Sequence, residues 1–150
     1  MGDSWVTETM GQGMADNSNV DVLVVDDDPR LADLFAAWLE PNWTVRTAYD
    51  GEQALEAVDN SIDVVVLDRR MTGLSGDEVL SLLRASGYDC SVIIVSAIDP
   101  SIDRLEADWD DYLVKPISKA TLLEKIERVT SRRPRRTIDR EDDPVDSPVN

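Results

Sequence analysis

The sequence predicts an α/β protein of three layers, in which a five-stranded parallel sheet lies between two layers of helices. Four short, unbroken apolar runs rich in β-branched residues each end at a polar or charged residue: Val22–Val25, Val64–Leu67, Val92–Val95 and Tyr112–Val114. Such runs are typical of strands that are buried on both faces of a parallel sheet. Segments with apolar residues at helical spacing separate them, so strands and helices alternate.

The first strand leads into a helix that begins at Pro29. Asp28 is placed to cap this helix, since Asp is favoured at the N-cap and proline at the first helical position. Its buried face is expected to comprise the apolar residues Leu31, Leu34, Phe35, Trp38 and Leu39. Pro41 ends the helix, and Thr44–Ala48 forms a short second strand.

The middle of the chain contains two pairs of residues with capping-box spacing, Asp50 with Gln53 and Ser75 with Glu78. Each pair predicts the start of a helix, and the strand Asp63–Leu67 separates the two helices. The expected buried residues are Ala54, Leu55 and Val58 in the first helix, and Val79, Leu82 and Leu83 in the second.

The remaining elements are the fourth strand, a short fourth helix within Pro100–Ala107, the fifth strand Asp111–Val114 and a last helix capped by Ser118. The last helix has an apolar side made by Leu122, Leu123, Ile126 and Val129. Each crossover has room for a helix, so the connections should be right-handed and the strands parallel. In a doubly wound sheet the first and third strands are neighbours, and of the common orders of such sheets we expect 2-1-3-4-5.

One domain is expected over residues 20–130. Residues 1–19 are polar and Gly-rich, which predicts a disordered lead-in. Residues 131–150 are rich in Arg, Asp and Pro, which predicts a disordered charged tail too short to build a further domain. Either the domain stands alone or it is a fragment of a longer protein.

The formal net charge of −16 argues against general nucleic-acid binding, which needs a basic face. Only three of the 15 basic residues are lysines, against 31 acids, and this balance favours a protein of a salt-saturated cytoplasm over an ordinary acidic one. Histidine is absent and Cys90 is the single cysteine, which excludes His-based catalysis and an internal disulfide. Without a membrane-length apolar run or a signal pattern, a cytoplasmic location is expected.

Acidic residues follow two strands that are neighbours in the predicted sheet. Asp26 and Asp27 come after the first strand, and Asp68 ends the third. Three converging carboxylates repel one another and suit a hard cation with oxygen ligands, Mg²⁺ or Mn²⁺. Ser96 and Lys115, at the ends of the fourth and fifth strands, complete the material for a phosphate site. The alternative for any one of these acids is a solvated loop residue.

The segments VVDDDP, VVVLDRRMTGLSG, VIIVSA and YLVKP, in this order, resemble the receiver domain of two-component response regulators, the CheY-like superfamily with its flavodoxin-like fold. The resemblance covers residues 20–130 and is greatest to haloarchaeal receivers. It implies that Asp68 accepts a phosphoryl group from a sensor histidine kinase. It also implies that Asp27 ligates Mg²⁺ directly and Asp26 largely through water, while Asp68 and the Arg70 backbone carbonyl complete the protein ligands.

The same resemblance implies roles for three further residues. Lys115 and the Ser96 hydroxyl would contact the phosphoryl oxygens, and Ser96 with Tyr112 would form the switch pair that repacks the output surface. Two departures from the family pattern are Thr72, where proline is usual, and Asp108-Trp109, where Gly-Ala is usual. Trp109 is then either a contact residue on the output surface or a plug in the core.

The function expected from the sequence is therefore signal relay by a receiver that catalyses only its own phosphorylation and dephosphorylation. Its partners would be a sensor histidine kinase, an unknown downstream protein and, as one option, a second copy of itself. Two alternatives are a pseudo-receiver that serves as a binding module and a Mg²⁺-dependent phosphohydrolase. The phosphohydrolase would use Asp26 and Asp28, which have the two-residue spacing of that class.

Overall fold

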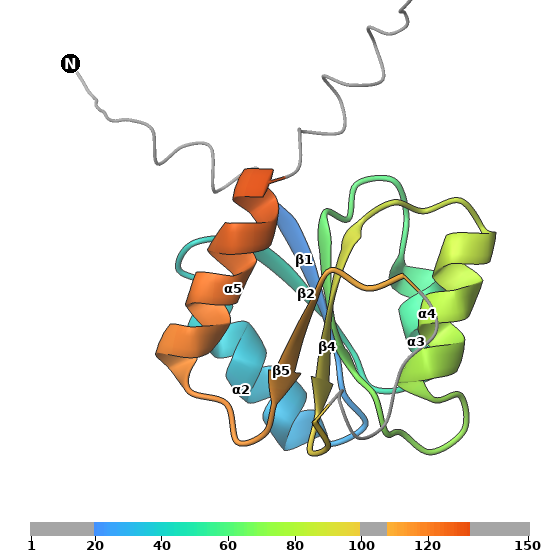
Figure 1. The fold of residues 1–150 in the computed structure, drawn as a ribbon, viewed down its shortest axis with the longest axis horizontal. Coiled ribbons are helices and arrows are strands. Elements are labelled where there is room, and N and C mark those ends of the chain that lie inside the picture. The colour runs from blue at the N-terminus through green and yellow to red at the C-terminus, as the bar shows by residue number, and fades with distance from the viewer. Residues whose placement is uncertain (1–19, 100–107, 133–150) are drawn as a thin grey trace, which may run out of the picture.

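Five parallel strands form the central sheet of the computed structural model (Figure 1), which describes residues 20–99 and 108–132. In chain order they are β1 (Asp21–Val25), β2 (Thr44–Ala48), β3 (Val64–Asp68), β4 (Ser91–Ser96) and β5 (Asp111–Val114). The order across the sheet is β2-β1-β3-β4-β5, and every pair of neighbours is parallel. The predicted fold class and strand order are confirmed.

Helices cover both faces of the sheet. In the described part of the chain they are α2 (Pro29–Leu39), α3 (Gly51–Ala57), α4 (Gly76–Ala85) and α5 (Lys119–Arg132). Helices α2 and α5 lie on one face, and α3 and α4 lie on the other (Figure 1). The predicted short helix at 100–107 lies outside the described residues, as do the predicted lead-in and residues 133–150 of the predicted tail. None of the described helices has the length and apolar composition needed to cross a membrane.

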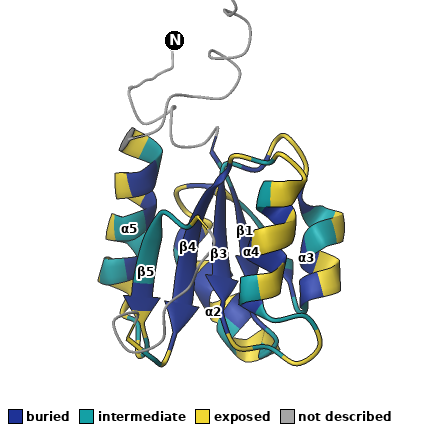
Figure 2. Cartoon of the chain, turned by 45° about the vertical axis from the view of Figure 1, so that its right-hand side comes forward, coloured by how far each residue is buried: buried dark blue, intermediate teal, exposed yellow. Residues whose placement is uncertain are grey.

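The core consists of two apolar layers, one on each side of the sheet. Alternate residues of β1, β3 and β4 point into opposite layers, and all three strands are buried (Figure 2). Leu39 and Ile126 fill the layer under α2 and α5, while Leu80 and Leu83 fill the layer under α4. Each such fully buried side chain contributes about 1.5–3 kcal/mol to folding.

The helix caps hold the loops that follow the strands. Ser75 and Glu78 form the predicted capping box at the start of α4, with hydrogen bonds of 3.1 and 2.9 Å. At α3 the predicted box is only half formed: Asp50 accepts from the Gln53 amide at 2.7 Å, but the Gln53 side chain accepts from the Tyr49 amide. The complete capping box at α4 therefore fixes the point at which the loop after β3 enters this helix.

Two leucines predicted to be buried are exposed. Leu34 in α2 is 42% exposed and Leu82 in α4 is 43% exposed. The buried stripes instead follow the spacing i, i+3, i+4, i+7: Ala32, Phe35, Ala36 and Leu39 in α2, and Gly76, Val79, Leu80 and Leu83 in α4. Small residues therefore occupy contact positions against the sheet, and the two leucines lie at the edges of the stripes.

Candidate functional site

Three carboxylates meet at the carboxyl ends of β1 and β3. Val25 lies opposite Leu67 in the parallel ladder, so the residues that follow on the two strands are neighbours. One oxygen from each of Asp26, Asp27 and Asp68 lies within 4.8 Å of the others. Asp26 and Asp68 are buried, and Asp27 is half-buried. The structure thus brings together the three acids that the sequence singled out.

Lys115 reaches the same cluster from the end of β5. Its amide donates to the Ser96 carbonyl at 2.8 Å, which extends the ladder between β4 and β5 by one residue. Its Nζ lies 3.3 Å from Asp68 Oδ1 and 3.8 Å from Asp26 Oδ2. The Lys115–Pro116 peptide bond is cis. One ammonium group therefore faces two buried carboxylates.

This single lysine does not balance the buried acids. Burial, followed by the nearby charge of Asp26, raises the pKa of Asp68 to about 6, and Lys115 opposes that rise only in part. Burial also raises the pKa of Asp26, against the opposing effects of the Asp28 amide and Lys115. Asp26 Oδ2 is buried and accepts no hydrogen bond within the described part of the chain. A cluster of carboxylates that includes a buried oxygen without a hydrogen-bond donor is suited to bind a hard divalent cation such as Mg²⁺.

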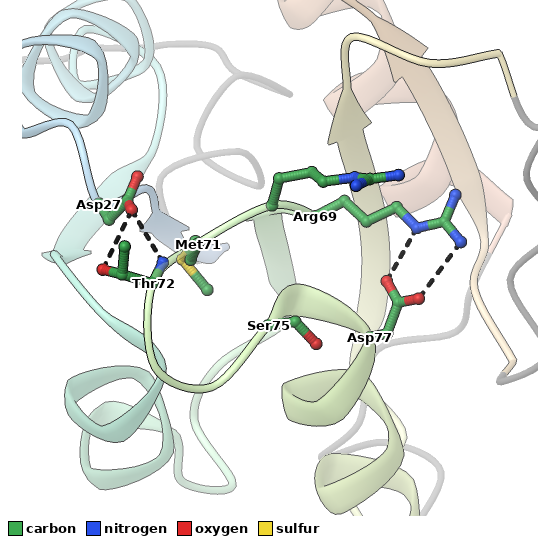
Figure 3. Close-up of a pocket in the computed structure, with 7 residues that line it drawn as sticks. Asp27, Arg69, Met71, Thr72, Ser75 and Asp77 are labelled. Carbon is green, nitrogen blue, oxygen red and sulfur yellow. Dashed lines mark hydrogen bonds and ion pairs between the residues drawn. The ribbon is translucent and has the colours of Figure 1, made fainter.

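The loop after β3 is fastened to the acid cluster through Thr72. The Thr72 amide donates to Asp27 Oδ2 at 3.1 Å, and the Thr72 hydroxyl lies 3.5 Å from the same oxygen (Figure 3). A proline at this position would have no amide hydrogen to donate. Arg70, whose backbone carbonyl is a predicted metal ligand, lies on the same loop and lines a pocket of about 550 Å³ beside Asp27.

Ser96 and Tyr112, the predicted switch pair, are linked through one residue. The buried Ser96 hydroxyl accepts from the Ile98 amide at 3.1 Å. The half-buried Tyr112 donates its hydroxyl hydrogen to the Ile98 carbonyl at 2.8 Å. Trp109 is half-buried. It packs edge-on against the Tyr112 ring, with centroids 5.5 Å apart, and against the core layer on that face. This packing agrees with a role in the core, and the exposed part of the side chain leaves the role of contact residue as a prediction.

Two residues beside Asp68 were given no role by the sequence. Arg69 is buried, and its guanidinium pairs with Asp77 and donates to the Tyr112 hydroxyl. Hydrogen bonding to Asp77 raises the pKa of Arg69 above its ordinary value. Gly76 packs so tightly that a Cβ there would clash with the Asp68 carbonyl oxygen and lie 2.7 Å from Arg69 Cα. The available signal was a glycine at the first helical position, directly after a capping serine.

The fold and the acid cluster define an α/β domain with a candidate cation site at the carboxyl edge of its sheet. The family model of the response regulator receiver domain matches residues 22–127, and the chain belongs to that family. The resemblance seen in the sequence is therefore confirmed.

Similar proteins include transcriptional regulators and isolated receiver domains. A candidate transcriptional regulator of Haloferax volcanii is 46% identical over 112 residues, which are 74% of this chain and 19% of that protein. The transcriptional regulatory protein PrrA of Mycobacterium tuberculosis is 42% identical over 117 residues, which are 75% of this chain and 50% of PrrA. The chain thus spans half or less of these two relatives.

Two of the similar solved structures match over almost their whole length. The receiver domain of the Francisella response regulator 1452 has 34% identity and a TM-score of 0.68, with 76% of this chain and 98% of that chain covered. The response regulator TrrA of Thermotoga maritima, solved with Mg²⁺ and BeF, has 32% identity and a TM-score of 0.65, with 73% and 98% covered.

Proposed function

We propose that this chain is a phosphorylatable receiver that accepts a phosphoryl group from a sensor histidine kinase on Asp68. The observation that carries the proposal is the convergence of Asp26, Asp27 and Asp68 within 4.8 Å, with Lys115 Nζ 3.3 Å from Asp68. Phosphoryl transfer requires alignment and neutralisation of charge more than covalent assistance. A carboxylate between a lysine and a cation site meets both needs.

In the proposed step, an Asp68 carboxylate oxygen bonds to phosphorus while the bond from phosphorus to the donor's imidazole nitrogen breaks. The electron pair leaves with that nitrogen. The other ring nitrogen of the donor carries a proton, so the donor leaves as neutral histidine and Asp68 becomes an aspartyl phosphate. These 150 residues contain no histidine, so the donor imidazole lies outside them. Lys115 would pair with one phosphoryl oxygen, and the Ser96 hydroxyl would donate to another.

A bound Mg²⁺ would neutralise charge on the phosphoryl oxygens, and Mn²⁺ could serve in the same way. The residues proposed to hold it are Asp26, Asp27, Asp68 and the backbone carbonyl of Arg70. The buried Asp26 Oδ2 supports this set, because it accepts no hydrogen bond within the described residues and the nearby Lys115 Nζ, 3.8 Å away, lies closer to Asp68.

The kinase is proposed to dock along α2. An apolar groove of about 450 Å³ is lined by Leu31, Leu34, Phe35, Trp38, Lys115, Pro116 and Ile117. A protein seated there lies next to Lys115 and therefore beside Asp68. This role accounts for Leu34, an exposed leucine at the border of the groove.

Phosphorylation would then change the face that a downstream protein binds, through Ser96 and Tyr112. Because the matching relatives are longer transcriptional regulators, that downstream element could be a nucleic-acid-binding domain of a longer chain or a separate protein. The acid-rich, lysine-poor composition supports function at high salt, as does the similarity to a Haloferax protein.

The test is intact mass after incubation with Mg²⁺ and acetyl phosphate in high KCl, for the wild type and Asp68→Asn, with EDTA as the metal control. One phosphoryl adduct that needs Mg²⁺ and is absent from the variant supports the proposal. Folded wild type that forms no adduct and binds no beryllofluoride would refute it in favour of a binding module. Turnover of a generic phosphate ester would instead indicate a phosphohydrolase. The phosphohydrolase alternative would use Asp28 as its second acid. The Asp28 side chain instead caps α2 by accepting from the Arg30 amide at 3.0 Å, and this favours the receiver.

A further inference from the structure

Arg69 follows the proposed phosphoacceptor directly, and the proposed function leaves it without a role. We propose that Arg69, fixed by Asp77, is a positioning residue for Tyr112. It holds Tyr112 in the position seen here, called inward, in which the hydroxyl bonds to the Ile98 carbonyl, before any phosphoryl group is present. The signalling consequence rests on the proposed function. The position of Tyr112 itself can be measured on the unphosphorylated protein.

Asp77 fixes the direction of the Arg69 side chain. The guanidinium donates through Nε and Nη2 to the two Asp77 carboxylate oxygens, at 2.8 and 3.2 Å (Figure 3). Such two-pronged pairs between arginine and a carboxylate are strong and directional. Asp77 lies in the first turn of α4, where the helix dipole favours negative charge. The capping box and the tight packing of Gly76 hold that turn in place, so the guanidinium has a rigid support.

The remaining terminal nitrogen of Arg69 holds Tyr112. Arg69 Nη1 donates to the Tyr112 hydroxyl oxygen at 3.0 Å, and the Tyr112 hydroxyl donates to the Ile98 carbonyl at 2.8 Å. In the inward position the hydroxyl therefore has an acceptor, the Ile98 carbonyl, and a charged donor, the Arg69 guanidinium. An outward rotation of Tyr112 would lose both hydrogen bonds and the edge contact with Trp109.

This arrangement biases the proposed switch toward the inward position. A hydrogen bond to a charged group is strong enough that its loss changes a two-state ratio about tenfold. Arg69 should therefore keep Tyr112 inward in most unphosphorylated molecules. Phosphorylation of Asp68 would act on an equilibrium that already favours this position, so the change at Tyr112 would be small in the wild type and larger without Arg69.

The test uses the complete chain labelled with 3-fluorotyrosine, in high KCl and without metal or phosphodonor. The chain has three tyrosines, and a Tyr112→Phe variant assigns the ¹⁹F resonance of Tyr112. The change of its chemical shift between H₂O and D₂O reports how exposed the ring is. The variants are Arg69→Met, which keeps the apolar stem but loses the guanidinium, and Asp77→Asn. Arg46→Met is the control, because Arg46 lies on edge strand β2 and pairs with Asp59 at 3.5 Å.

We expect a small isotope shift for Tyr112 in the wild type and in Arg46→Met, and a clearly larger one in Arg69→Met and Asp77→Asn. Beryllofluoride with Mg²⁺ should then move the Tyr112 resonance further in Arg69→Met than in the wild type. An unchanged Tyr112 resonance in Arg69→Met would overturn the inference. If circular dichroism shows that this variant is unfolded, an unchanged resonance in Asp77→Asn overturns it.

Intact mass separates the two proposals. If Arg69→Met takes up a phosphoryl group while its Tyr112 resonance matches that of the wild type, the positioning role alone is refuted. If the wild type takes up none, the proposed function is refuted, while the comparison of Tyr112 positions in the unphosphorylated proteins still decides whether Arg69 holds this side chain.

Discussion

Replacing Asp68 by asparagine should stabilise the folded protein at neutral pH in the absence of divalent cations. The pKa of Asp68 rises from 3.8 to about 6, first because of burial and then because of Asp26, despite Lys115 at 3.3 Å. At about 1.4 kcal/mol for each pH unit, this rise corresponds to about 3 kcal/mol. The ionised carboxylate lowers the free energy of unfolding by that order, and asparagine removes the charge at nearly constant shape. We therefore expect a gain of about 2–3 kcal/mol.

The gain should depend on pH in a defined direction. Because the folded state binds the Asp68 proton more tightly than the unfolded state, the wild type loses stability as pH rises from about 4 through about 6. The asparagine variant lacks this titration. The difference in free energy of unfolding should thus be near zero below about pH 4 and reach its full size near pH 7.

Urea unfolding followed by circular dichroism, in multimolar KCl with EDTA, measures both quantities. Asp111→Asn is the matched control, because Asp111 also has a lysine at 3.3 Å, Lys125, but lies outside the acid cluster. We expect no gain in that variant. If Asp68→Asn is less stable than the wild type at pH 7, the ion pair with Lys115 outweighs burial and repulsion by Asp26, and the reasoning is wrong.

Three further predictions concern the loop after β3 and the surface charge. Gly76→Ala should lower the free energy of unfolding by about 1–3 kcal/mol in urea titrations, because a Cβ clashes with the Asp68 carbonyl oxygen, whereas Ser81→Ala on the exposed side of α4 should not. Thr72→Pro removes the amide that donates to Asp27 Oδ2, so calorimetry should show an Mg²⁺ affinity about fivefold higher than in the wild type. Thr72→Ala keeps the amide and should leave the affinity unchanged. Equal Mg²⁺ affinities of Thr72→Pro and the wild type would contradict this prediction. With a net charge of −16, the melting temperature should rise steeply with KCl, and a flat profile would remove the halophilic interpretation.

The sheet and the acid cluster could be predicted from the sequence. The buried apolar runs indicate parallel strands, and parallel strands all end at the same edge of the sheet. An apolar run such as Val64–Leu67 can be buried on both faces only inside a covered parallel sheet. Parallel strands then deliver their following residues to one edge, so Asp26 and Asp68 had to meet once β1 and β3 were neighbours. That part of the site needs no knowledge of side-chain packing.

Helix faces were predicted less well, because apolar size was a poor guide to contact. Leu34 and Leu82 are large, yet both are more than 40% exposed. Ala32 and Gly76 are small and buried, since a helix that lies close to a sheet needs little side chain at its nearest points. For Leu34, exposure is itself informative, because this side chain borders the groove that reaches Lys115.

Arg69 shows where prediction from the sequence stops. An arginine in a loop is ordinarily expected in solvent, and its partners here are Asp77, eight residues away, and Tyr112, on another strand. Arg69 lies in the loop after β3, whereas its partners lie in α4 and β5, so no repeat within one element connects them and only the folded arrangement shows the pairing. The acids that would bind metal are placed by strand ends, whereas the setting of Tyr112 depends on which charged group lies beside it. The balance of the proposed switch should therefore vary with Arg69 and Asp77 even where the acid cluster is unchanged.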